Sequence, residues 1–254
     1  MSVIIGVDKT FKVSKQEYGA FKYIDLDIIQ TPSEIFIDQR KCINDLKLIK
    51  ITRQRMLQKD DELTSEEKKN LRSLCDQLLW VTSQSRPDCA FDSCYVSNYG
   101  KNPTVHNLNE ANKALKKLKM TNLGLTFPNL GNPENLSVVV YGDATHASLP
   151  SGASQGAHIV FLCGNGLVSP ITWRSKKLDR VTKSPLASET MALSESADAG
   201  YFVASMVKEL FNLNHVPAVT CKTDNHSLKE HLESTKIIQD LRLRVDIARL
   251  REMI

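Results

Sequence analysis

The chain has 254 residues, of which 41% are hydrophobic and 24% are charged. This length and composition favour a globular protein that buries a core, in one large domain or two smaller ones. Lys plus Arg exceed Asp plus Glu by 33 minus 29, or four, a mild basic excess that is compatible with nucleic acid without requiring it. No apolar run approaches the roughly 18 residues of a membrane span, and residues 1–11 lack the pattern of a signal peptide, so neither secretion nor membrane association is expected.

The cysteines argue for a reducing compartment. They lack a CxxC pair and a Cys/His zinc spacing, so we expect scattered reduced thiols in a cytoplasmic or nuclear protein. The six are Cys42, Cys75, Cys89, Cys94, Cys163 and Cys221.

The first part of the chain predicts a β-hairpin followed by a helix. Apolar and polar residues alternate over 21–28, break at 31–33 and resume over 34–38. Apolar residues at helical spacing then predict a helix within 39–48. Residues 23–27 superficially match the paired aspartates of a polymerase, but Leu26 separates Asp25 from Asp27, so no DNA polymerase activity is expected. On one strand these two acids would share a face.

A mostly helical middle follows. Thr64 and the acidic residues after it predict a helix start, and the helix should stop before Arg86 and Pro87. Two more helices are expected over 88–99 and 108–120. The apolar face of the first helix should comprise Leu71, Leu74, Cys75, Leu78 and Leu79.

Residues 121–137 are rich in Asn, Gly and Pro and predict a linker, with a domain boundary near residues 132–133. Beyond it the pattern indicates three antiparallel strands, a long helix, another strand and two helices. This order predicts a mixed α/β fold. The expected strands cover 136–141, 157–163, 168–174 and 218–223, with an Asn-Gly turn joining the second to the third, and the expected helices cover 186–210, 227–232 and 240–253.

Three acidic residues have spacings typical of a two-metal nuclease. Asp143 and Asp224 each end an apolar strand, and Glu189 opens the long helix. Carboxylates at the ends of neighbouring strands, with another on a helix across the sheet, bring several hard oxygen ligands to one point. Such a point binds Mg²⁺, and two ions about 4 Å apart flank a phosphodiester during attack by water. Taken singly, Asp143 and Asp224 are as well explained by capping, and Glu189 as an ordinary first-turn acid.

Five sequence pieces, in order, resemble the ribonuclease H segment of copia-type retrotransposon Pol polyproteins. The part upstream resembles the region after the reverse transcriptase active site in the same polyproteins, through residues 21–23, the hairpin leading to residue 39, and residues 71–91. The resemblance thus covers nearly the whole chain. The five pieces are residues 141–144, 171–177, 188–195, 223–227 and 244–247.

The resemblance implies a ribonuclease H-like mixed sheet with flanking helices, preceded by a β-hairpin and a mostly helical connection region. The implied domains are a remnant of the reverse transcriptase palm and thumb over 1–60, a helical connection region over 61–132, and a ribonuclease H-like domain over 133–254. Family members continue beyond the point that corresponds to Ile254, so we expect a C-terminally truncated domain here.

The resemblance also implies a metal-dependent endonuclease that cleaves the RNA strand of RNA–DNA hybrids. Asp143, Glu189 and Asp224 would hold two Mg²⁺ ions, for which Mn²⁺ would substitute, and Asp246 would be the fourth carboxylate. The implied partners are the hybrid and the polymerase part of a Pol polyprotein. Residues expected to face nucleic acid are Lys176, Lys177, Arg180, Asn225 and His226.

Several alternatives remain open on the sequence. Asp246 is also explained as an exposed helix acid balanced by nearby arginines, His226 as an exposed helix start, and the basic residues of 176–180 as a solvated loop. At the level of function, the alternative is a catalytically inactive retroelement remnant with residual nucleic-acid binding. A weaker alternative is an integrase or transposase core. The tryptophans Trp80 and Trp173 are expected to be core aromatics.

Overall fold

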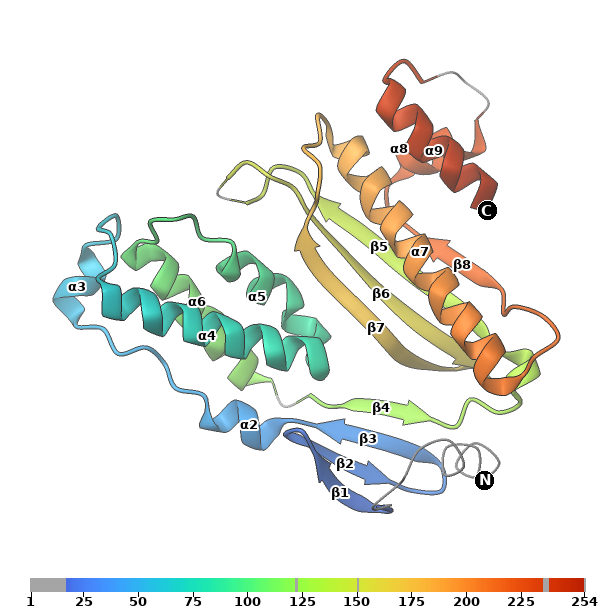
Figure 1. Cartoon of the computed structure of the whole chain (residues 1–254), viewed down its shortest axis with the longest axis horizontal. Coiled ribbons are helices and arrows are strands. Elements are labelled where there is room, and N and C mark those ends of the chain that lie inside the picture. The colour runs from blue at the N-terminus through green and yellow to red at the C-terminus, as the bar shows by residue number, and fades with distance from the viewer. Residues whose placement is uncertain (1–16, 122, 150, 235–237, 254) are drawn as a thin grey trace.

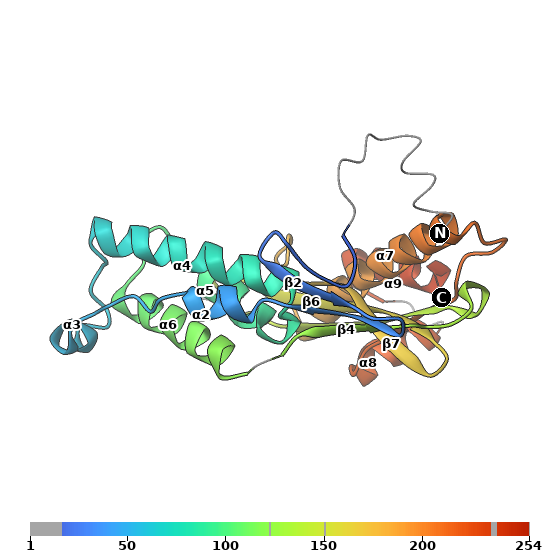
Figure 2. The same ribbon diagram turned by 90° about the horizontal axis from the view of Figure 1, so that it is seen from below.

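The computed structural model describes residues 17–121, 123–149, 151–234 and 238–253. Residues 1–11, whose sequence argues against a signal peptide, lie outside these ranges. Within these ranges there are two four-stranded sheets, with strand orders β1-β2-β3-β4 and β7-β6-β5-β8. Figure 1 shows helices α4, α5 and α6 on one side and the second sheet with α7 on the other. Figure 2 shows the same arrangement from below, with the strands between the two groups of helices.

The first sheet is antiparallel and consists of β1 (Ala20–Tyr23), β2 (Leu26–Gln30), β3 (Glu34–Asp38) and β4 (Leu125–Pro128). The predicted hairpin from β2 to β3 is confirmed. The prediction of one strand over 21–28 is wrong, because Ile24 and Asp25 have φ of 44° and 62° and turn the chain between β1 and β2. Two consecutive positive φ values make the tight turn that suits a twisted hairpin. Asp25 therefore lies in a turn and does not share a strand face with Asp27.

The stretch predicted as a linker, residues 121–137, contains β4. This strand pairs antiparallel with β3, in a register that places Ile35 opposite Phe127. It is short and flanked by Asn, Gly and Pro, so its alternation of apolar and polar residues was too brief to recognise in the sequence. One edge strand of the first sheet, β4, thus comes some ninety residues after its neighbour β3 in the chain.

The helical middle is confirmed and contains more helices than expected. Thr64 and Glu67 form the expected capping box at the start of α4, with Thr64 N donating to Glu67 Oε2 at 2.8 Å. The helix ends at Gln84, before Arg86 and Pro87 as predicted. Leu79 is 39% exposed and does not share the buried face of α4. The elements here are α2 (Arg40–Asp45), α3 (Arg53–Leu57), α4 (Ser65–Gln84), η1 (Pro87–Cys89), α5 (Ala90–Ser97) and α6 (Val105–Met120).

Arg86 is a buried charge at the centre of this helical layer, with only 1% of its surface exposed. Its guanidinium donates to Asp88 at 2.7 and 2.8 Å, and to the carbonyl oxygens of Leu118 at 2.8 Å and Thr121 at 3.0 Å. These carbonyls lie at the C-terminus of α6, where helical partners run out. Burial raises the pKa of Asp88, but the hydrogen bonds to its carboxylate and the positive charge of Arg86 together outweigh this and hold the pKa below its usual value.

The second sheet is mixed, as predicted. It contains β5 (Ser137–Thr145), β6 (Gln155–Gly164), β7 (Leu167–Lys177) and β8 (Val219–Lys222). β5, β6 and β7 are antiparallel neighbours, whereas β8 pairs parallel with β5. Asn165 and Gly166, with φ of 51° and 74°, form the expected turn between β6 and β7.

α7 (Pro185–Phe211) crosses one face of this sheet, and α9 (Leu241–Met253) packs on α7, while α8 (His226–Glu233) follows β8 (Figure 1). The close approach of α7 to β5 depends on small residues. A methyl group on Gly142 would overlap Oγ of Ser196, and one on Gly200 would overlap Val140. The core between helix and sheet consists of Leu136, Val138, Val140, Val160, Val203, Ala204, Val207 and Leu213.

Two side chains tie the helical layer to the second sheet. Trp173 on β7 donates from Nε1 to the carbonyl oxygen of Thr82 at 2.7 Å, and Gln155 donates from Nε2 to that of Phe91 at 3.3 Å. Trp173 is thus part of a contact between layers. Trp80, expected in the core, is 40% exposed.

All six cysteines are free thiols in the structure, as predicted. Among the described residues, no helix combines the length and the apolar character needed to cross a membrane.

Replacement of Arg86 tests the importance of this buried charge. We expect Arg86→Met to lower the free energy of unfolding by about 3 to 5 kcal/mol, because it leaves Asp88 and two carbonyl groups without their donor. Urea denaturation followed by circular dichroism measures this. Arg72→Met, at an exposed site on the same layer, is the control and should cost less than about 0.5 kcal/mol. Equal losses in the two variants would contradict a stabilising role for Arg86.

Candidate metal centre

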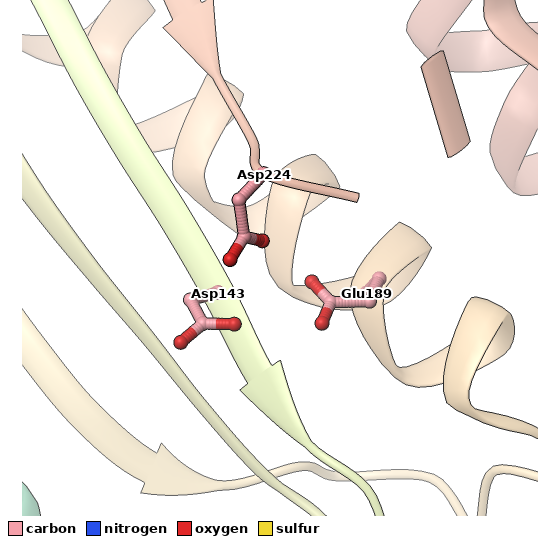
Figure 3. A group of neighbouring side chains, drawn as sticks. All are labelled: Asp143, Glu189 and Asp224. Carbon is pink, nitrogen blue, oxygen red and sulfur yellow. The ribbon is translucent and has the colours of Figure 1, made fainter. Parts of the chain in front are cut away.

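The parallel pairing of β5 with β8 brings two of the predicted acids to the same end of the sheet. Tyr141 lies opposite Lys222 in this ladder. Asp143 and Asp224 each follow this pair by two residues, so they come at equivalent positions on adjacent chain segments. Figure 3 shows their carboxylates side by side.

α7 supplies the third acid from across the sheet. Ser184 caps this helix by accepting from Ala187 N at 3.2 Å, and Pro185 occupies the first turn, where its missing N–H costs nothing. Glu189 follows one turn later. It lies seven residues before Ser196, hence on nearly the same helix face, and Ser196 is the residue that rests against Gly142. The face that packs on β5 is therefore the face that carries Glu189.

The three side chains converge on one point. Each offers a carboxylate oxygen such that these oxygens all lie within 4.8 Å of one another, and Figure 3 shows the groups turned inward. Asp143 and Asp224 are exposed, whereas Glu189 is only 8% exposed. The structure thus brings Asp143, Glu189 and Asp224 together, which the sequence spacing alone did not establish.

The electrostatics of Glu189 are those of a carboxylate that lacks a counter-charge. Burial, and then the negative charges of Asp143 and Asp224, raise its pKa from 4.5 to about 7. Its Oε2 atom is buried and has no hydrogen-bond partner in the structure. Buried polar atoms of this kind are rare and call for a specific explanation. A divalent cation among the three carboxylates would provide one, because hard oxygen ligands at this spacing suit Mg²⁺ or Ca²⁺.

Helix capping does not account for the two aspartates. α8 is capped by Asn225, whose Oδ1 accepts from Leu228 N at 2.9 Å, and not by Asp224. Asp143 lies inside β5, where its Oδ1 accepts from the adjacent Ala144 N at 2.7 Å. Nor does Glu189 fit an ordinary first-turn acid, since such a group is solvated.

Asp246, predicted as the fourth carboxylate, lies on α9 outside the group of three. Its Oδ2 accepts from Arg180 Nη2 at 2.7 Å. The partner is therefore an arginine from the loop before α7. Arg249, which lies on the same helix as Asp246, instead forms an ion pair with Asp198 at 2.6 Å.

The residues expected to face nucleic acid have varied surroundings. Lys176 pairs with Asp179 at 2.8 Å and with Glu195 at 3.1 Å, and Arg180 is engaged by Asp246. Lys177 is exposed at the end of β7, and His226 is exposed at the first position of α8. Asn225 is the helix cap, so its amide oxygen is already in use.

A cleft of about 700 Å³ opens beside Asp143 and Asp224. The sheet forms one wall of this cleft, and η1 with the start of α5 forms the other. Sequence inspection missed this feature because its two walls come from segments far apart in the chain. Its side chains include Phe91, Tyr141, Trp173, Arg174 and Lys222, and the Lys222 ammonium lies 5.5 Å from the centre of the Tyr141 ring.

His146 is a second feature that the sequence did not reveal. It follows Asp143 by three residues, and its Nδ1 lies 2.9 Å from Oγ of Ser188, next to Glu189. No motif or period marks this pair, since the two residues are 42 positions apart.

No family model matches the chain. It is 29% identical over 148 residues to the putative transposon Ty5-1 protein of Saccharomyces cerevisiae, an alignment that covers 57% of this chain and 43% of that protein. It is also 29% identical over 139 residues to the retrovirus-related Pol polyprotein from transposon RE2 of Arabidopsis thaliana, covering 54% of this chain and 9% of the polyprotein. These matches support homology with retrotransposon Pol proteins. The chain spans less than half the length of each relative.

The raised pKa of Glu189 predicts a pH-dependent stability in metal-free protein. Because the folded state holds this proton more tightly than the unfolded state, the stabilisation is complete below about pH 4.5 and is lost as the pH rises through about 7. We expect the free energy of unfolding to fall by up to about 3 kcal/mol over this range from this group. Urea denaturation in chelator at about pH 5 and about pH 8 measures the change.

Glu189→Gln is the control, because it keeps the shape of the side chain and cannot ionise. The free energy of unfolding of wild type, relative to that of this variant, should fall as the pH rises. An identical pH profile for the two proteins would show that Glu189 has an ordinary pKa.

Proposed function

We propose that the chain is a metal-dependent endonuclease of ribonuclease H type that cleaves the RNA strand of RNA–DNA hybrids. The observation that carries the proposal is the convergence of carboxylate oxygens of Asp143, Glu189 and Asp224 within 4.8 Å of one another, from a strand, a helix and the segment after a parallel strand. The similarity to retrotransposon Pol proteins supports it. The substrate class follows from the resemblance of residues 141–247 to retrotransposon ribonuclease H segments.

Each acid has a distinct task in this proposal. Asp143 and Asp224 present exposed carboxylates toward the cleft and would hold cations where a phosphodiester can approach. Glu189 closes the site from the buried side, and its unpartnered Oε2 is the atom that a cation would satisfy. Bound Mg²⁺ would activate the attacking water and stabilise the leaving 3′-oxygen. The protein groups therefore need only to position the cations, and none has to act as the nucleophile.

The cleft fits access by a nucleic-acid backbone. Arg174 and Lys222 line it next to the carboxylates and would contact phosphate groups. Phosphate contacts of this kind release counterions, so binding should weaken as salt rises. The contacts carry no sequence information, and we propose cleavage without strong base preference.

One observation favours a second candidate, a catalytically inactive retroelement remnant that retains nucleic-acid binding. Asp246, proposed as a fourth carboxylate, is paired with Arg180 away from the other three. A centre with three carboxylates binds a second cation less firmly than one with four.

Cleavage of a labelled RNA–DNA hybrid in Mg²⁺ or Mn²⁺ tests the function. We expect the wild-type chain to cut the RNA strand and leave duplex DNA intact. Asp143→Asn and Asp224→Asn should each lower the rate by at least about 100-fold, since even outer-shell changes at metal sites cost 10-fold to 100-fold.

Asp76→Asn is the matched control, because Asp76 is an exposed aspartate on α4, away from the carboxylates. It should cleave like wild type. Salt-sensitive hybrid binding without cleavage by any form would support the inactive remnant. Cleavage that survives in both site variants would show that the catalytic centre lies elsewhere.

A further inference from the structure

Four polar side chains form a cluster beside the carboxylates, in which Ser154 and Ser188 are buried and His146 and Thr182 are partly buried. Oγ of Ser188 lies 2.9 Å from Nδ1 of His146 and 2.8 Å from Oγ1 of Thr182, and Oγ of Ser154 lies 2.7 Å from Oγ1 of Thr182. Ser188 is 0% exposed and Ser154 is 3% exposed. None of the four belongs to the proposed ligand set.

The short contacts form a hydrogen-bonded chain that satisfies every hydroxyl. Ala147 N donates to Oγ of Ser154 at 3.1 Å. In the His146 tautomer with an unprotonated Nδ1, the Ser154 hydroxyl can donate to Thr182, Thr182 to Ser188, and Ser188 to Nδ1 of His146. Each hydroxyl donates once and accepts once, which is the condition for a stable buried polar network.

This series of hydrogen bonds connects the segments that carry Asp143 and Glu189. His146 follows Asp143 by three residues and lies, like Ser154, in the connection between β5 and β6. Ser188 immediately precedes Glu189 on α7, and Thr182 lies in the segment that leads into α7. The bond from Ser188 to His146 therefore joins the start of α7 to the chain just after Asp143.

Hydrogen bonds add to packing at this end of α7, where Met191, Ala192 and Leu193 are buried. The close contact between Gly142 and Ser196 lies seven residues beyond Glu189, which is about 10 Å along the helix. A displacement of about 1 Å at a ligand is enough to cost much of the activity of a catalytic site.

We infer that Ser188 and His146 are positioning residues, which fix Glu189 relative to Asp143 and thereby set the affinity of the centre for divalent cations. This inference rests on the proposed metal centre. It is separable from hybrid cleavage, because the cation affinity of the chain can be measured without any nucleic acid.

Mn²⁺ titration of the purified chain, followed by electron paramagnetic resonance of the free ion, tests the inference. We expect Ser188→Ala and His146→Leu each to weaken Mn²⁺ binding by about 10-fold to 100-fold, the usual effect of losing a group that orients a ligand. His146→Asn, whose amide oxygen can replace Nδ1 as the acceptor, should restore most of the affinity. A purely structural role for His146 would not distinguish Leu from Asn.

Ser93→Ala is the matched control. Ser93 is also a buried helix serine, 1% exposed, and donates to the carbonyl oxygen of Cys89 in the helical layer. This variant should lose a similar buried hydroxyl yet bind Mn²⁺ like wild type. Circular dichroism should show that each variant is folded, and Ser154→Ala, two hydrogen bonds from Ser188 through Thr182, replaces Ser188→Ala if the latter does not fold.

The outcomes separate this inference from the proposed function. Wild-type affinity in folded Ser188→Ala and His146→Leu would overturn the positioning role while leaving the nuclease proposal intact. A wild-type chain that binds Mn²⁺ but cleaves no hybrid would overturn only the nuclease proposal. A wild-type chain that binds no Mn²⁺ would overturn both.

Discussion

The site depends on the parallel pairing of β5 with β8. Asp143 and Asp224 are far apart in the chain, and only the register that sets Tyr141 opposite Lys222 makes them neighbours. A parallel pair requires a long crossover connection, which here contains β6, β7 and α7, and α7 covers one face of the sheet. The helix that makes this pairing possible also carries Glu189. α7 thus forms part of the crossover and also contributes a carboxylate to the site.

Arg86 and Glu189 are both buried, but they differ in whether their polar atoms have hydrogen-bond partners. Arg86 in the helical layer is fully enclosed, but it donates to a carboxylate and to two carbonyl oxygens at a helix end. Glu189 is enclosed beside two like charges, with one oxygen unpaired. The first arrangement stabilises the fold, whereas the second costs stability as long as no cation is present. An unfavourable group held in place by a well-packed helix is typical of a functional site.

The helical layer and the sheet that bears the acids are physically coupled. Trp173 and Gln155 donate to backbone carbonyls of the helical layer, and the cleft beside Asp143 and Asp224 has one wall from each part. The helical segment is therefore more than a spacer before the carboxylate-bearing sheet. It shapes the approach to the carboxylates, even though the two parts have separate apolar cores.

The sequence determined the type and order of most elements, because local signals decide them. The apolar run over residues 138–141, the capping box at Thr64 and the Asn-Gly turn at 165–166 each act within a few residues. The sequence also identified Asp143, Glu189 and Asp224, through their positions at the ends of predicted elements. It failed where the signal was short, as at β4, or where a two-residue turn with positive φ interrupted an alternating run, as at Ile24.

Only the tertiary structure decided which of the candidate residues meet. Asp246 was selected by resemblance, yet its carboxylate pairs with Arg180, because the packing of α9 on α7 sets where it points. The bond between His146 and Ser188 leaves no trace in the sequence, since neither residue type nor spacing distinguishes this pair from other polar residues. Contacts between distant segments depend on how helices and sheets pack, and local sequence patterns do not determine which distant residues that packing brings together.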